Sequence, residues 1–240
     1  MKRAHLDALL ADRAAKRPVV LATRIEDGRQ VLIHPDRAAT DGDDAVVAAA
    51  RQALKEDKSQ LVEIGGSSIF LHVFNPPLRM IIVGAVHIAQ PLSAMAALAG
   101  YSVTIVDPRG AFATEERFPG VEINTEWPDD AMKALAPDSR TAVVTLTHDP
   151  KLDDAALEVA LKSDAFYIGS LGSKKTHTAR RNRMGRLGFD EATVDRIHGP
   201  VGLPLGGRSP AEVATSILAQ VIAVRHADGK IERPALEVVR

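Results

Sequence analysis

After residue 77, short aliphatic runs alternate with stretches of helical character. The aliphatic runs cover residues 80–84, 103–106, 121–124, 142–146 and 165–168. The helices between them are expected at residues 87–99, 129–135 and 153–163. Near-continuous apolar strands separated by helices are typical of a parallel sheet that is buried on both faces. The alternation therefore predicts an α/β fold with a Rossmann-like doubly wound parallel sheet, in strand order 3-2-1-4-5.

Beyond residue 168 the strand pattern stops and only helices are expected. They cover residues 174–187, 190–196 and 210–227. The start of the last helix is marked by Ser209 as N-cap, Pro210 at the first helical position and Glu212 as the second member of a capping box. Residues 229–240 are expected to form a loose tail.

Two adjacent prolines, Pro76 and Pro77, mark a domain boundary, because neither can continue a helix or a central strand. β-rich runs precede them at residues 18–25, 30–34, 61–64 and 68–74, and residues 45–56 are helical in character. We therefore expect a small α+β domain with hairpins over residues 1–76. The Rossmann-like domain follows over residues 77–228.

Composition excludes several classes of function. Thirty Lys and Arg against 31 Asp and Glu give a formal net charge of -1, which does not favour a nucleic-acid partner. The absence of cysteine rules out a disulfide framework, a thiolate metal site, an iron–sulfur cluster and a cysteine nucleophile. No apolar run approaches the ~18 residues of a membrane span, and charges interrupt the first 17 residues too often for a signal peptide. We expect a cytoplasmic protein with no membrane partner.

Four chain segments leave the carboxyl ends of the expected strands and hold most of this half's unusual polar residues and glycines. They are residues 84–87, 107–109, 145–149 and 169–174. Ligands of open parallel sheets bind outside the carboxyl ends of the strands, where the strand order reverses. The sequence therefore predicts that the four segments meet in one crevice.

The first segment lies where a dinucleotide-binding fingerprint would lie. Gly84 begins it, but Val86 replaces the glycine that lets the backbone approach a pyrophosphate. Asp107 either holds a ribose diol or pairs with Arg109. His87 opens the expected helix, where the helix dipole disfavours its protonation, and it is either a neutral donor or ligand or a buried structural histidine. NAD binding and simple helix-to-strand packing both remain open.

The third segment places His148 beside several carboxylates just past a strand. Histidine and aspartate at this spacing bind a metal or transfer a proton in some proteins. The alternative is that Asp149 and Asp153 are turn and N-cap residues of the next helix.

The fourth segment combines small residues with the start of a basic helix. Small side chains, free amides, a helix N-terminus and nearby cations are the components of an anion site. Arg180 and Arg181 follow on the same helix, and Arg208, in a second glycine-rich loop, is a further candidate anion contact. The candidate residues of this segment are Gly169, Ser170, Gly172, Ser173 and Lys174.

Three ordered motifs resemble a known family. They are residues 145–154, residues 167–181 (YIGSLGSKKTHTARR) and residues 197–218 (IHGPVGLPLGGRSPAEVATSIL). They are similar to the XdhC/CoxI family of xanthine dehydrogenase accessory factors, and the resemblance covers nearly all of residues 77–226. The family's glycine–histidine turn corresponds to Gly84–His87 here, with Val86 in place of its middle glycine.

The resemblance implies a Rossmann-like domain that binds the molybdenum cofactor, a molybdopterin with or without a linked nucleotide. It also implies help with sulfuration of the cofactor by a partner cysteine desulfurase and with insertion into a molybdenum hydroxylase apo-enzyme. Many members carry a cysteine-bearing loop that this chain lacks, so a cysteine-bearing homologue is a further expected partner, and a homodimer is expected. An NAD(P)-dependent oxidoreductase is the first alternative, and a non-catalytic interaction subunit with a vestigial pocket is the second.

Overall fold

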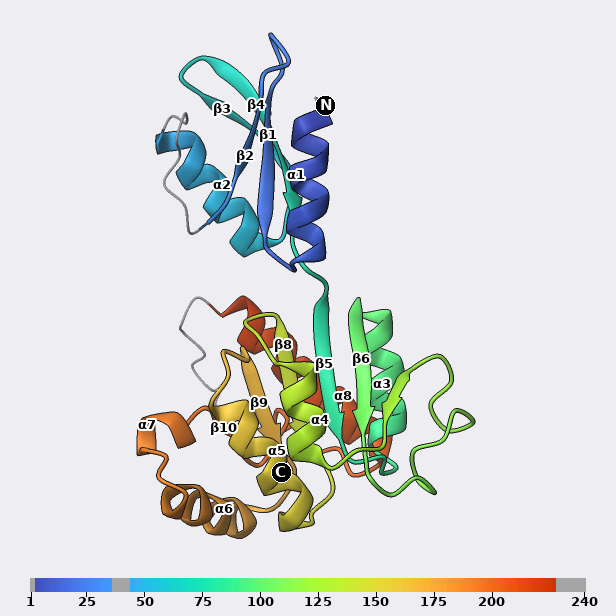
Figure 1. Ribbon diagram of the computed structural model, residues 1–240. Coiled ribbons are helices and arrows are strands. Elements are labelled where there is room, and N and C mark those ends of the chain that lie inside the picture. The colour runs from blue at the N-terminus through green and yellow to red at the C-terminus, as the bar shows by residue number, and fades with distance from the viewer. Residues whose placement is uncertain (1–2, 36–43, 228–240) are drawn as a thin grey trace. The chain divides into compact units, whose positions relative to one another are not determined.

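The computed structural model describes residues 3–35 and 44–227, and its contacts divide the chain into two units, Met1–Pro76 and Pro77–Arg240 (Figure 1). The expected tail at residues 229–240 lies outside the described residues. None of the helices in the described ranges is both long and apolar enough to cross a bilayer.

The smaller unit is a four-stranded antiparallel sheet with two helices. Its elements are α1 (Arg3–Ala14), β1 (Val19–Arg24), β2 (Gln30–Ile33), α2 (Asp44–Glu56), β3 (Gln60–Ile64) and β4 (Ser67–Phe74), and the strand order is β2-β1-β4-β3. The apolar side of α2 packs Val47 and Ala50 against Val20, Ile33 and Leu71 of the sheet. This unit is the α+β arrangement that the hairpin pattern predicts.

The larger unit is built on a six-stranded parallel sheet. Its strands are β5 (Leu78–Val83), β6 (Tyr101–Val106), β7 (Glu122–Asn124), β8 (Thr141–Thr145), β9 (Tyr167–Ser170) and β10 (Ile197–His198). They lie in the order β10-β9-β8-β5-β6-β7. Counted from β5, this is the predicted order 3-2-1-4-5 with one more strand beside the fifth. The Rossmann-like α/β fold is confirmed.

The expectation that the sheet ends after residue 168 is wrong. β10 pairs in parallel with β9, with Ile197 opposite Ile168 and His198 opposite Gly169. A strand of two residues is too short to show a period of two in the sequence, so the apolar pattern does not reveal it.

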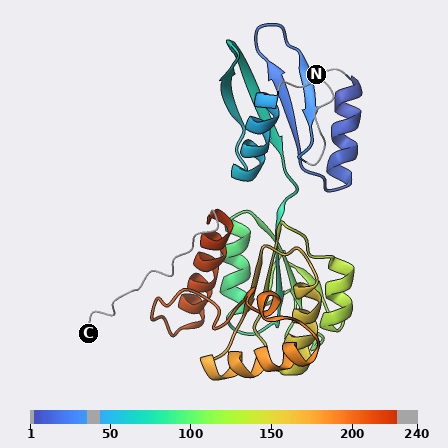
Figure 2. The same cartoon turned by 90° about the vertical axis from the view of Figure 1, so that its left-hand side faces the viewer.

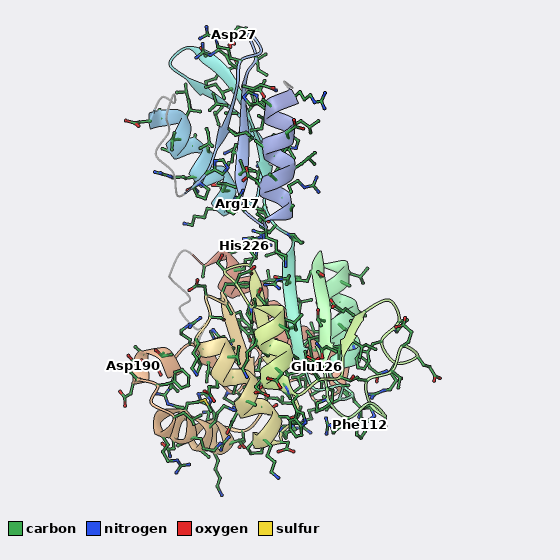
Figure 3. All side chains as sticks on the ribbon, viewed as in Figure 1. Arg17, Asp27, Phe112, Glu126, Asp190 and His226 are labelled. Carbon is green, nitrogen blue, oxygen red and sulfur yellow. The ribbon has the colours of Figure 1, made fainter. Side chains whose placement is uncertain are left out.

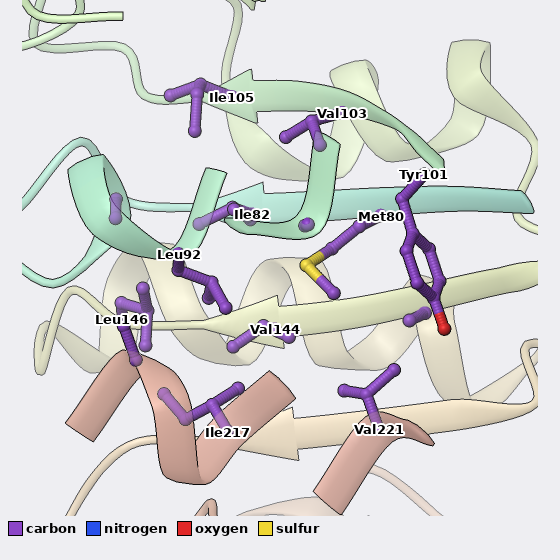
Figure 4. Packing of buried hydrophobic residues seen from close by; sticks show 14 of the residues in the cluster. Met80, Ile82, Leu92, Tyr101, Val103, Ile105, Val144, Leu146, Ile217 and Val221 are labelled. Atoms are coloured by element: carbon purple, nitrogen blue, oxygen red, sulfur yellow. The ribbon is translucent and has the colours of Figure 1, made fainter. Parts of the chain in front are cut away.

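Helices cover both faces of the sheet. They are α3 (Ala89–Leu98), α4 (Pro128–Leu135), α5 (Pro150–Leu161), α6 (Lys174–Arg186), α7 (Glu191–Val194) and α8 (Pro210–His226). α3 and α8 pack together on one face, and α4 and α5 pack together on the other (Figure 2). Figure 4 shows the first of these layers, where Leu92 of α3 and Ile217 of α8 contact Ile82 and Val144 of the sheet. The central strands are buried on both sides, which is why they read as continuous aliphatic runs.

Three element boundaries differ from the sequence expectation and change the placement of candidate residues. α3 begins at Ala89, so His87 lies in a turn before the helix rather than at its first position. α5 begins at Pro150, so Asp153 lies within the helix. β9 continues to Ser170, so Gly169 and Ser170 are strand residues.

Candidate functional site

The carboxyl ends of the parallel strands meet at one end of the larger unit, which we call the carboxyl edge. Phe112, which follows β6, and Glu126, which follows β7, lie at this end, and His226, at the end of α8, lies at the opposite end (Figure 3). The switch point of the sheet lies between β5 and β8, where the chain changes its direction of growth. Loops β5–α3 and β8–α5 therefore lie side by side at the place where this fold class binds ligands.

Gly84 permits a close approach of these two loops. Its φ is +110°, and a Cβ atom at this position would lie 2.6 Å from Thr147 Cγ2. Any side chain would be strained by the backbone and would also push the β8–α5 loop away. Gly84 is therefore needed for the geometry of the switch point, and its amide donates to the Val106 carbonyl oxygen at 2.8 Å.

Asp107 follows β6 and joins the β5–α3 loop to Arg109 through buried hydrogen bonds. Its carboxylate is fully buried, and it accepts hydrogen bonds from Ala85 N (2.7 Å) and from Nε (2.9 Å) and Nη2 (2.7 Å) of Arg109. Burial alone would raise the pKa of Asp107, but hydrogen bonds from Arg109 and from the Ala85 and Arg109 amides outweigh it and hold this pKa below its usual value. Of the two roles that the sequence leaves open, pairing with Arg109 is the one that the structure shows, and both carboxylate oxygens are engaged.

A second arginine, Arg117, holds the β6–β7 connection against the β5–α3 loop. Its Nη1 donates to the carbonyl oxygens of Ala85 (2.9 Å) and Phe112 (2.5 Å). The half-exposed ring of Phe112 carries the Arg109 guanidinium 4.9 Å from its centroid. Neither Arg117 nor Phe112 is among the residues predicted from the sequence. The bond from Arg117 to Ala85 joins residues 32 positions apart. The contacts of Phe112 with Arg109 and Arg117 are local, but no motif marks them.

His148, Asp149 and Asp154 are close in sequence, but each has a different structural role. His148 is exposed and has a φ of +63°, which is uncommon for a residue other than glycine. Asp149 is the N-cap of α5 and accepts from Lys151 N at 2.9 Å. Asp154 pairs with Arg183. Among the described residues no group of three or more His, Asp or Glu side chains is placed to hold a metal ion.

Asp153 is the buried carboxylate of this segment. It accepts hydrogen bonds from Thr147 Oγ1 (2.7 Å) and Thr147 N (3.2 Å), so it holds the β8–α5 loop rather than capping α5. Burial raises the pKa of Asp153 in spite of these bonds and of the nearby charges of Arg180 and His148. The pKa of Arg109 is raised, mainly by its hydrogen bonds to Asp107 and to a smaller extent by the charges of Asp149 and Asp153. Groups from the ends of β6, β8 and β9 thus share one electrostatic environment.

Two of the residues predicted for the anion site belong to the sheet instead. A Cβ atom on Gly169 would lie 2.5 Å from Val201 Cγ2 and 2.7 Å from the ring of Tyr167, so this glycine allows close packing of β9. Ser170 is buried, and its Oγ lies 2.5 Å from Thr145 Oγ1 across the β8–β9 pair. Neighbouring side chains fill the space beside both residues. Gly169 and Ser170 are therefore strand residues, which corrects their interpretation as loop residues.

The remaining residues of that segment form the turn into α6. Gly172 has a φ of +146°, and Ser173 caps the helix by accepting from Thr176 N at 3.1 Å. Lys174 is the first residue of α6 and is exposed. The first amides of a helix have no intrahelical acceptor. They follow β9 and are therefore near the carboxyl end of that strand.

Arg180 lies directly beneath this turn. Its side chain is 1% exposed, and its Nη2 donates to the Leu171 carbonyl oxygen at 2.8 Å. Burial lowers the pKa of Arg180, while the charges of Asp153 and Asp154 act in the opposite direction. Arg181, its neighbour in sequence, points elsewhere and pairs with Asp195. The burial of Arg180 has a sequence signal, because it lies four residues before the buried Met184 and so on the same helix face.

His87 and Arg208 are both exposed. Arg208 lies just before α8, where its backbone N–H donates to the Glu212 side chain at 3.0 Å. Ser209 and Glu212 form the capping box that the sequence predicts. The structure does not bring His87 or Arg208 into direct contact with another candidate residue in the described ranges.

Comparisons with known proteins agree with one another. The model of the XdhC Rossmann domain matches residues 80–221. A protein from Bacillus subtilis named as a probable xanthine dehydrogenase subunit is 30% identical over 160 residues, which is 66% of this chain and 46% of that protein. A molybdenum cofactor insertion chaperone from Escherichia coli is 32% identical over 152 residues, which is 63% of this chain and 42% of that protein. The chain thus spans less than half the length of these two relatives.

A solved structure has the same fold. The crystal structure of a xanthine dehydrogenase from Bacillus halodurans superposes with a TM-score of 0.65 at 23% identity, covering 96% of this chain and 67% of that one. At this level of identity the likeness concerns the fold alone.

Proposed function

Because this chain belongs to the family defined by the XdhC Rossmann domain, we propose that it is an accessory factor that binds the molybdenum cofactor. In this proposal it assists sulfuration of the cofactor and its insertion into a hydroxylase of the xanthine dehydrogenase or CO dehydrogenase type. The cofactor, with or without a linked nucleotide, is cargo that the chain passes on. The names of two similar proteins, a molybdenum cofactor insertion chaperone and a probable xanthine dehydrogenase subunit, support this proposal.

The observation that carries the proposal is the composition of the carboxyl edge. A pterin phosphate is an extended anion, and this edge offers it the amides at the start of α6, Lys174 and the underlying Arg180. A chain with a net charge of -1 that offers a few N–H donors and cations at this edge suits a small anionic ligand better than a polymer. The exposed His87 and His148 flank the switch point and are the side chains proposed to contact the pterin or metal end.

The chain's own chemistry limits its part in sulfuration. A persulfide donor requires a cysteine, and the sequence has none. We therefore propose that a cysteine desulfurase supplies the sulfur, with or without a cysteine-bearing homologue, while this chain, as a homodimer, holds and shields the cofactor. The apo-hydroxylase is the proposed recipient.

The nicotinamide alternative fits the geometry less well. The acidic residue that would hold an adenosine ribose is Asp107, and both of its oxygens already accept bonds from Ala85 and Arg109. Val86 replaces the glycine at which a pyrophosphate approaches the backbone.

Two experiments test the proposed function. Small-molecule mass spectrometry of the protein purified natively from molybdenum-replete cells should detect a pterin, whereas a nicotinamide would favour the alternative. In a deletion strain the hydroxylase polypeptide should be present and folded but inactive. The exposed pair His87→Ala with His148→Ala should fail to restore its activity, and His226→Ala, at the opposite end of the same unit, should restore it (Figure 3). Full activity of the double variant would make an interaction protein with a vestigial pocket the better description.

A further inference from the structure

Arg180 is a buried charge whose hydrogen-bonding capacity is largely unused. Its Nη2 donates to Leu171 O, but Nε and Nη1 are buried and have no hydrogen-bond partner among the described residues. No carboxylate in the described ranges lies within ion-pair distance of it. Asp153 and Asp154 act on its pKa only through space, and Asp154 is itself paired with Arg183. Leaving donors of a charged group buried and unpaired is costly, so a guanidinium in this state indicates that an acceptor is missing.

The position of Arg180 shows where that acceptor belongs. Its Nη2 lies 3.7 Å from the point that a Cβ atom on Gly172 would occupy, so the guanidinium sits under the turn between β9 and α6. The same turn presents the first amides of α6, those of Lys174 and Lys175, which have no acceptor within the helix. The buried guanidinium and the unpaired amides at the helix start therefore belong to the same turn.

We propose that Arg180 and the amides at the start of α6 form a seat for a phosphate group, in which the anion accepts from the buried guanidinium. Three features define the ligand class. The donors are all N–H groups, which excludes a cation. A fully buried guanidinium favours a group that brings negative charge, and the tetrahedral oxygens of a phosphate accept from several directions at once. The missing side chain at Gly172, beside Thr176 and Arg180 Nη2, lets the guanidinium lie close to the backbone of the turn.

That the phosphate is the one on the proposed cofactor rests on the proposed function, whereas the seat itself does not. A phosphate monoester of a pterin and that of a mononucleotide share the chemistry. Both are therefore included as ligands in the test, beside inorganic phosphate.

The test is calorimetric titration of the full chain with inorganic phosphate at constant ionic strength. Arg180→Gln is expected to weaken binding roughly tenfold or more, the ratio expected when one hydrogen bond to a charged group is lost. Arg181→Gln is the matched control, because it removes the same charge from the next residue of α6, whose side chain is one-third exposed and paired with Asp195. It should change affinity by only about twofold, as expected for a screened surface charge.

A second variant and a spectroscopic measurement keep the test decisive if Arg180→Gln does not fold. Gly172→Ala adds a methyl group 3.0 Å from Thr176 Cγ2 and next to the guanidinium, so it should reduce phosphate binding while Arg180 remains. In the unmodified protein, phosphate should shift the Nε–H resonance of Arg180 and leave that of Arg181 in place.

The outcomes separate the two proposals. The seat would be overturned by any one of three results: no saturable phosphate binding, equal affinities of the Arg180 and Arg181 variants, or an Arg180 resonance that phosphate does not shift. In the last two cases the phosphate binds adventitiously at surface lysines. Phosphate binding that depends on Arg180, in a protein that carries no pterin, would support the seat and refute the proposed cargo. Tighter binding of the pterin phosphate than of the mononucleotide identifies the pterin as the source of the group.

Discussion

Replacing Asp107 by alanine is expected to destabilise the larger unit by about 1–4 kcal/mol. The buried Ala85 N–H would lose its only acceptor in the described structure, at a cost of roughly 1–3 kcal/mol for an unpaired buried donor. The bonds from Arg109 contribute less, about 0–1 kcal/mol, because its side chain is 38% exposed and water would solvate the freed guanidinium. Asp107→Asn keeps one carbonyl oxygen for Ala85 N, so about 1–2 kcal/mol is expected.

The assay is urea unfolding followed by fluorescence. Trp127 is the only tryptophan of the chain and lies in the larger unit, so its emission reports on this unit rather than on the smaller one. Glu126→Gln is the control, because this exposed carboxylate lies at the same edge and its loss should stay within about 0.5 kcal/mol.

The pH dependence gives an independent check. The pKa of Asp107 is lower in the folded state, so its contribution is present above the unfolded value of 3.8 and is lost as the pH falls through the folded pKa. Asp107→Asn should therefore flatten the acid limb of the stability profile. A loss of less than about 1 kcal/mol in Asp107→Ala, with an unchanged acid limb, would refute the claim that this carboxylate holds the β5–α3 loop.

Three further predictions concern the same edge. Gly169→Ala should lower the free energy of unfolding by about 1–3 kcal/mol, because its methyl group would overpack against Val201 and Tyr167. Gly185→Ala, in open space on α6, should raise it by about 0.5–1 kcal/mol. Equal unfolding midpoints of the two variants would contradict the close packing at Gly169. Burial raises the pKa of Asp153, so the free energy of unfolding should fall as the pH rises from about 4 and Asp153 ionises. Asp153→Asn should lack this fall in urea unfolding at a series of pH values. Identical pH profiles of the variant and the unmodified protein would contradict the raised pKa. NAD and NADP should bind weakly, and Val86→Gly should improve their affinity in calorimetry without producing oxidoreductase activity; a low-micromolar affinity of the unmodified protein would show that Val86 is no obstacle.

The central strands could be predicted because each is buried on both faces, and their order is the one expected from the doubly wound fold that such strands indicate. Ile81, Ile82, Val143 and Val144 are almost fully inaccessible, so every position of these strands must be apolar and the runs stand out from the helices between them. The same reasoning fails for β10, where two residues give no period, and for β9, where Gly169 and Ser170 look like loop residues but are strand residues.

The contacts of the site could be predicted only in part. The pairing of Asp107 with Arg109 is local and appears among the sequence alternatives. The bond from Arg117 to Ala85 joins residues 32 positions apart, and nothing in either segment encodes it. Arg180 lies in a helix whose composition indicates a solvated basic face, and only its four-residue spacing from Met184 indicates burial. Which of several arginines is buried depends on the packing of the β9–α6 turn.

The central position of β5 has a consequence for synthesis of the chain on the ribosome. β5 needs partners on both sides, and β6 follows it closely, whereas β8 begins at Thr141, 58 residues after the end of β5 at Val83. At a synthesis rate of about 5–20 residues per second, one edge of this apolar strand stays unpaired for roughly 3–12 s. Unpaired apolar edges are sites of aggregation. Nascent chains halted shortly before Thr141 should therefore be the ones most dependent on chaperones, and those that already expose β8 should be largely independent of them.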